Sequence, residues 1–235
     1  MYRTRQIRIK KGSRLYPYCW QMCHAAARLY NRGTYLIRQY ATAEGRLEKG
    51  VELTENQREA YDMIREITVN TKFSPKKKWL TYGQLDYILK RTEDEAYRRM
   101  PAQANQQILK CITRNFSSFF ESAKKYTKNP EAFTGRPMMP GYKKKDGMAT
   151  AILTNQICKI KEGKDLRFPG TPDRMNIGKM EDTMRLKEVR IKPQADSFVI
   201  DIVMEVRRGA VAQRNVLADM EEEQLVKYLS QSTAL

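Results

Sequence analysis

The sequence predicts an α+β fold in two lobes, in which a bundle of helices interrupts a small β-barrel. Three observations support this fold class. A segment with the alternation of a strand comes first, at residues 2–10, helical spacing of apolar residues dominates 14–126, and short strand-like segments fill 149–206. If the first strand pairs with the later strands, the helices form an insertion between them.

The helical block predicts four helices from the spacing of its apolar residues, at 14–44, 54–68, 81–91 and 101–126. Ser13 is expected as the N-cap of the first helix. Thr54 is followed three residues later by Gln57, and Thr81 by Gln84, and both pairs fit a capping box. The second and third helices are therefore expected to begin at these threonines.

The second half of the chain predicts short strands, at 149–154, 157–161, 165–168, 186–192 and 197–206. The last of these alternates cleanly and is rich in β-branched residues. A loop rich in Pro, Gly and Lys, at 127–147, separates the strands from the helices. A partial apolar stripe at about 215–230 predicts one more helix near the C-terminus.

The charge of the chain is strongly positive, with 44 Lys and Arg against 27 Asp and Glu and a formal net charge of +17. Residues 207–235 hold four basic and four acidic side chains, so the whole excess belongs to residues 1–206. Such an excess is typical of proteins with a polyanionic partner, most often nucleic acid. A basic membrane-surface protein is the rival, but the sequence has neither a long basic amphipathic helix nor a lipidation signal.

Several function classes find no support in the residues. The four cysteines are too few for a disulfide framework, and no apolar run or leader suggests a membrane or secretory protein, so we expect a cytoplasmic one. Cys19, Cys23 and His24 lack a second pair of zinc ligands. No convergent acidic residues or Gly-rich phosphate loop suggest catalysis, and we expect neither a metal nor a cofactor.

The stretch MPAQANQQILKCITRNFSSFF, at 100–120, has two faces when it is drawn as a helix. The apolar face predicted to meet the core holds Leu109, Ile112, Phe116, Phe119 and Phe120, and the polar face holds Gln103, Gln107, Lys110, Arg114 and Ser117. A solvated surface is the plain interpretation of the polar face. However, glutamate is absent from 101–120. Glutamine can bond base edges and Lys and Arg neutralise phosphates, so we favour contact with nucleic acid.

Basic residues also cluster in the loops. Between 101 and 170 there are 13 basic and five acidic side chains. The clusters comprise Lys76, Lys77 and Lys78 in one loop, and Lys124, Lys125, Lys128, Arg136, Lys143, Lys144 and Lys145 in and around the other. Tyr126, Phe133 and Tyr142 are interleaved with the second cluster and could stack on unpaired bases. The alternative is a solvated loop whose aromatic rings pack into the core.

In sequence order, the stretch at 100–120 is followed by KKYTKNPEAFTGRPMMPGYKKKDG, LTNQICKIKEG, LKEVRIKP and SFVIDIVMEV. This series resembles the N-terminal half of the TnpB (OrfB) family of transposon-encoded, RNA-guided DNA nucleases, which are related to the miniature type V CRISPR effectors. The segment AARLYNRGTYLIRQY of the first helix fits the same family. The resemblance covers about residues 2–206.

The resemblance implies a wedge domain, an oligonucleotide-binding-like β-barrel, at 1–12 and 137–206, with a helical recognition domain at 13–136. The remaining residues, 207–235, form a tail for which the apolar spacing predicts a helix. In the family these two domains hold the guide-RNA scaffold and read a short motif beside the DNA target, while guide pairing supplies the specificity. Carried onto this chain, the helix at 101–126 offers Gln103, Asn105, Gln107, Lys110 and Arg114 to nucleic acid. Lys143, Lys144, Lys145, Asn155, Gln156 and Lys159 then lie on the wedge side, near RNA.

In the family a RuvC-like nuclease domain follows the last of these segments, whereas only 29 residues follow it here. We therefore expect a non-catalytic protein that binds guide-type RNA and inhibits or regulates a related nuclease by competing for that RNA. Three alternatives stay open: an accessory subunit that docks on a full-length nuclease through its tail or an exposed apolar face, a DNA-binding repressor that needs no RNA, and a decayed fragment. Target DNA and the full-length nuclease are the further candidate partners, and no membrane is expected.

Overall fold

The computed structural model describes residues 1–206, so the helix expected at 215–230 lies outside the described residues. The fold is α+β, as predicted. The helices are α1 (Tyr16–Leu47), α2 (Glu55–Thr68), α3 (Tyr82–Arg91), α4 (Glu95–Arg98) and α5 (Ala102–Lys128), followed by the 3-10 turn η1 (Pro130–Ala132). The strands are β1 (Tyr2–Lys10), β2 (Ala151–Thr154), β3 (Lys159–Lys161), β4 (Asp165–Arg167), β5 (Arg174–Asn176), β6 (Met184–Pro193) and β7 (Ser197–Val206).

Two antiparallel sheets collect the strands, one in the order β1-β7-β6-β2 and one in the order β3-β4-β5. β1 pairs with β7 along its whole length, from Tyr2 opposite Glu205 to Lys10 opposite Ser197. Within residues 1–206 the first strand therefore pairs with the last, and the helices of this range lie between β1 and the other strands in sequence. Within residues 1–206 the sheets stay open and form no closed barrel, because β2 pairs over only four residues and β3–β5 form a separate ladder.

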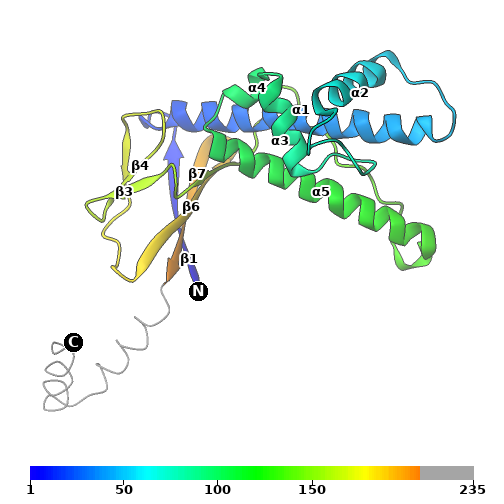
Figure 1. Cartoon of the computed structure of the whole chain (residues 1–235). Coiled ribbons are helices and arrows are strands. Elements are labelled where there is room, and N and C mark those ends of the chain that lie inside the picture. The colour runs from blue at the N-terminus through cyan, green and yellow to red at the C-terminus, as the bar shows by residue number, and fades with distance from the viewer. Residues whose placement is uncertain (207–235) are drawn as a thin grey trace, which may run out of the picture.

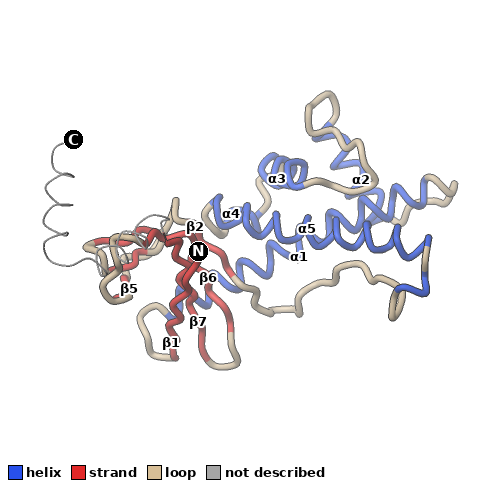
Figure 2. The backbone as a smooth tube through the Cα atoms, turned by 90° about the horizontal axis from the view of Figure 1, so that it is seen from below, coloured by secondary structure: helices blue, strands red, loops and turns tan. Residues whose placement is uncertain are grey.

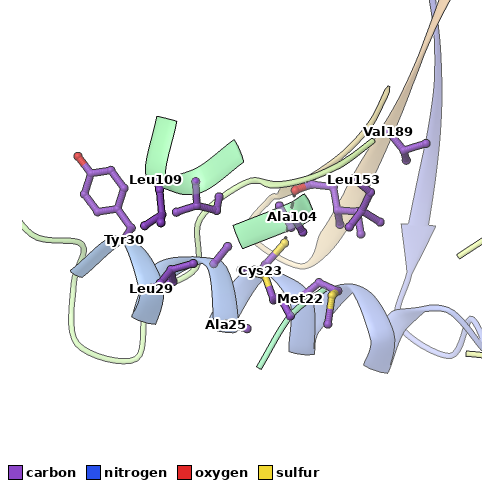
Figure 3. Close-up of a cluster of buried hydrophobic side chains, with 14 of the residues drawn as sticks. Met22, Cys23, Ala25, Leu29, Tyr30, Ala104, Leu109, Leu153 and Val189 are labelled. Carbon is purple, nitrogen blue, oxygen red and sulfur yellow. Dashed lines mark hydrogen bonds between the residues drawn. The ribbon is translucent and has the colours of Figure 1, made fainter. Parts of the chain in front are cut away.

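The long helix α1 spans the molecule, with the sheets at one end and the other helices packed along it (Figure 1). One hydrophobic core joins the helices to the four-stranded sheet. Figure 3 shows it where Cys23 and Leu29 of α1 meet Leu109 of α5, Leu153 of β2 and Val189 of β6. This shared core fixes the position of α5 relative to the sheet.

A glycine allows the close contact between α1 and α5. A Cβ atom at Gly33 would lie 2.8 Å from Cδ1 of Ile112 and 3.3 Å from Cδ2 of Leu85, which are both fully buried. The absence of a side chain at Gly33 therefore lets α3 and α5 pack directly against the backbone of α1.

The starts of the helices confirm one predicted capping signal and contradict another. The capping box at the start of α2 is present, since Gln57 N donates to Thr54 Oγ1 at 3.4 Å and Thr54 N donates to Gln57 Oε1 at 3.0 Å. The prediction of Ser13 as an N-cap is wrong. Tyr16 N donates to the backbone oxygen of Ser13 in a tight turn, and Leu15 holds the N-cap position without a side-chain bond.

No helix among the described residues has both the length and the apolar character needed to span a membrane.

Candidate nucleic-acid interface

Helix α5 has the two faces expected from its sequence. Leu109, Ile112 and Phe116 are fully buried, while Lys110 and Arg114 are exposed to solvent. Gln103 and Gln107 are half-buried and lie on the same polar stripe. The helix holds a single acidic residue, Glu121, against five basic ones, so its outer face is positively charged.

Asn105 does not lie on this outer face, so the prediction that it contacts nucleic acid is wrong. The residue is only 1% exposed, and its amide group donates hydrogen bonds to the backbone oxygens of Tyr97 and Met100. Position 105 falls at the edge of the apolar stripe, next to the buried Ala104. The side chain therefore holds the segment that leads from α4 into α5 and has no surface to offer a ligand.

A groove lies between α5 and the segment that leads into α3, and we call it the α5 groove. Its volume is about 460 Å³, and it is lined by Lys77, Trp79, Leu80, Thr81, Tyr82, Lys110, Thr113, Arg114 and Ser117. Within the described part of the chain, the lining holds three cationic side chains, two aromatic rings and the hydroxyl groups of two threonines and one serine. It holds no carboxylate. Lys77, Lys110 and Arg114 were predicted from the sequence, whereas Trp79 and Tyr82 were missed.

The aromatic rings of the α5 groove are held in place by packing. Trp79 stacks on Phe120 with ring centroids 4.5 Å apart and an interplanar angle of 18°, and the neighbouring Leu80 is fully buried. Lys77 Nζ lies 5.5 Å from the centroid of the Trp79 ring, and Lys110 Nζ lies 5.4 Å from that of Tyr82. The segment at 77–82 is therefore anchored against α5, with its cations beside its rings.

Tyr82 keeps its proton at neutral pH. Burial raises the pKa of its hydroxyl, and the nearby carboxylate of Asp86 raises it further. Gln84 Oε1 accepts a hydrogen bond from the Thr81 backbone N–H at 2.7 Å and fixes the start of α3 beside the groove.

The loop between η1 and β2 runs back along the helices toward the sheet (Figure 2). Asn31 of α1 holds it with two hydrogen bonds: its amide donates to the Lys143 oxygen at 3.1 Å, and its oxygen accepts from Lys143 N at 2.7 Å. Arg38 donates to the Pro140 oxygen at 2.9 Å, and its guanidinium lies 5.4 Å from the ring centroid of Tyr142. These contacts fix the backbone of the loop while the side chains of Lys144 and Lys145 stay exposed.

The turn after β2 places the last predicted residues on the surface. Asn155, Gln156 and Lys159 are all exposed, and Lys159 Nζ donates to the backbone oxygen of Asn155 at 3.2 Å. The structure thus gathers Lys77, Lys110 and Arg114 around one groove. The cations of the return loop and of this turn form separate groups, because they are positioned by α1 and by the sheet edge instead.

Most of the predicted cations are free to meet a ligand. Lys76, Lys124, Lys125, Lys128 and Arg136 are exposed. Within residues 1–206, Lys78 is the one member of the predicted set with an ion-pair partner, Glu48 at 2.6 Å. Exposed cations without carboxylate partners are suited to neutralise phosphates.

Residues 1–206 contain no group of three or more His, Cys, Asp or Glu side chains that could hold a metal ion. Burial raises the pKa of the Cys19, Cys23 and Cys158 thiols to about 12, so all three are neutral at physiological pH. His24 packs against Trp20, with ring centroids 4.1 Å apart and ring planes inclined by 50°.

Comparison of the chain with protein-family models and with curated proteins found no match, so the basic surface and its geometry are what bear on function.

Proposed function

We propose that this chain is a non-catalytic protein that binds guide-type RNA and regulates a TnpB-like nuclease by competing for that RNA. The observation that carries the proposal is the set of exposed, unpaired cations on α5, in the loop before α3 and in the return loop between η1 and β2. Together they account for much of the formal charge of +17. A structured RNA presents a dense array of phosphates that such a surface attracts.

The topology supports a wedge-like and a recognition-like part. The helices follow the first strand of the four-stranded sheet, and the remaining strands follow the helices. In this proposal the two open sheets are the counterpart of the oligonucleotide-binding-like wedge, and α1–α5 are the counterpart of the recognition domain. The turn at 155–159 and the return loop then contact the RNA scaffold from the sheet side.

The first test is to purify the chain with its bound nucleic acid and sequence what is recovered. We expect one structured RNA species to be enriched over total cellular RNA. Cleavage of a DNA target by a full-length TnpB-family nuclease loaded with that RNA is then measured with and without the chain. Competition predicts that cleavage falls as the chain is added and recovers when more RNA is supplied. No enriched RNA together with unchanged cleavage would contradict the proposal.

A pair of variants separates the surface from charge in general. Replacing Lys143, Lys144 and Lys145 with glutamine is expected to weaken RNA binding and inhibition together. Lys49 is exposed on the turn after α1 and belongs neither to the return loop nor to the predicted set, so Lys49→Gln is expected to leave both unchanged. RNase treatment before a DNA gel-shift assay tests the repressor alternative, because only that alternative predicts a shift that survives the treatment.

A further inference from the structure

We propose that the α5 groove receives one unpaired base of the bound strand and stacks it against Trp79. This inference rests on the proposed function, since it assigns a nucleotide site within the RNA-binding surface. It also goes beyond that function, because charge alone would bind a duplex and a single strand in the same way.

The size and shape of the α5 groove suit a nucleotide. Its volume of about 460 Å³ falls in the range of about 300–1,000 Å³ that is typical of small-ligand sites. Trp79 is half-buried and lines the groove, and its stacking on Phe120 fixes the plane of the indole. A base that stacks on a ring already held in position orders few additional protein groups, which favours binding.

The polar groups of the groove fit the rest of a nucleotide. Lys77 Nζ lies over the Trp79 ring and Lys110 Nζ over the Tyr82 ring, and Lys77 is expected to move from the indole when a base stacks there. Together with Arg114, both lysines can then neutralise the phosphates on either side of the base. The Thr113 hydroxyl already donates to the Leu109 oxygen at 3.0 Å, so its lone pairs are left to accept from a base amine. No carboxylate among the described lining residues repels the phosphates.

An aromatic ring can stack only on a base whose face is open. In a duplex each base is covered by its neighbours, and unstacking it costs a few kcal/mol, about as much as the ring returns. In loops, bulges and single strands the bases can be splayed onto aromatic side chains. The α5 groove therefore selects an unpaired nucleotide, while the surrounding exposed lysines bind paired and unpaired strands alike.

The chain contains two tryptophans, and one of them lines the α5 groove, so binding there can be followed by indole fluorescence. In the Trp20→Phe variant of the full chain, Trp79 becomes the only indole. Oligouridylate RNA of about 12 nucleotides is expected to quench its emission saturably, because a stacked base quenches indole fluorescence. Duplex RNA of the same length is expected to bind with little quenching. The Trp79→Phe variant, which keeps Trp20 alone, is the control and should show little quenching with either RNA.

Affinity gives an independent readout. Loss of one base–aromatic stack of about 1–3 kcal/mol predicts that Trp79→Ala weakens oligouridylate binding roughly 5- to 150-fold, with duplex binding almost unchanged. Trp20→Ala removes a tryptophan outside the groove and should not alter either affinity. Because Trp79 packs on Phe120, Trp79→Leu is the second variant: it keeps most of the volume and loses the aromatic face. Circular dichroism identifies the variants that remain folded.

The outcomes distinguish a failure of the base site from a failure of the RNA-binding function. Oligouridylate binding without quenching of Trp79, or with equal affinity for Trp79→Leu, overturns the base site and leaves the RNA-binding function standing. Failure of the unmodified chain to bind either RNA overturns both. Oligothymidylate DNA is the last arm: equal quenching by DNA supports a site that reads the base and ignores the sugar, and quenching by RNA alone supports a site specific for RNA.

Discussion

Asn105 shows how a polar side chain on the apolar stripe of a helix can serve the interior. Its amide bonds the two backbone oxygens of Tyr97 and Met100, just before α5. Removing the amide in Asn105→Ala leaves both acceptors buried and unpaired, which is expected to lower the free energy of unfolding by about 1–3 kcal/mol. Chemical denaturation measures this loss.

Gln107→Ala is the matched control, because Gln107 is a half-buried amide two residues along the same helix with no comparable pair of partners among the described residues. We expect its stability to stay within about 0.5 kcal/mol of the unmodified chain. Weaker RNA binding by folded Asn105→Ala, at unchanged stability, would return Asn105 to the binding surface.

The four cysteines are expected to differ sharply in reactivity. Cys111 is exposed on the outer side of α5, whereas Cys19, Cys23 and Cys158 are buried and burial raises the pKa of their thiols to about 12. Since the thiolate is the reactive form, iodoacetamide at pH 8 to 9 should modify one thiol per folded chain and all four after denaturation. Mass spectrometry counts the adducts. Rapid modification that persists in Cys111→Ser would show that a second thiol is accessible.

At the scale of elements, the signals that predicted the fold are local ones. Apolar spacing predicted α1 and α5, and the capping box predicted where α2 begins. The short elements α4 and β5 were missed, since four or three residues are too few to show a period. Whether the strands close a barrel depends on pairing between strands that are far apart in the sequence. The alternation of residues along one strand does not report this pairing.

The candidate site divides in the same way. Exposed lysines could be predicted, because a charged side chain seldom lies inside without a partner. The groove could not, because Trp79 and Tyr82 reach α5 only when Leu80 is buried in the core and α3 is in place. The one available signal was the sequence of three lysines followed directly by a tryptophan, at residues 76–79.

The return loop is expected to depend strongly on Asn31 of α1. Asn31→Ala removes both side-chain hydrogen bonds to the backbone of Lys143. The loop should then open more often, so trypsin is expected to cut after Lys143, Lys144 or Lys145 several times faster, because cleavage follows the population of the open form. Gln21→Ala, which replaces an exposed amide on the same helix, is the control. Equal digestion of the two variants would mean that Arg38 and Pro140 hold the loop unaided.

For the molecule as a whole, binding is expected to weaken steeply with salt, because each neutralised phosphate releases counterions. Every cation that contacts a single strand adds about 0.7 to the slope of log K against log salt concentration. Replacing Lys143, Lys144 and Lys145 with glutamine should therefore reduce the slope by about 2, as measured by fluorescence anisotropy between 50 and 300 mM salt. Lys49→Gln should keep the full slope. A triple variant with an unaltered slope would place these lysines outside the contact.

The pairing of β1 with β7 has a consequence for how the protein is made. Tyr2 lies opposite Glu205, so β1 leaves the ribosome long before its partner β7 has been made. The helices between them make mostly local contacts and can assemble during translation, whereas the sheet closes last. Until then the unpaired edges of β1 are open to any other nascent strand, and its arginines and lysine, at 3, 5, 8 and 10, act as gatekeepers against such misassembly.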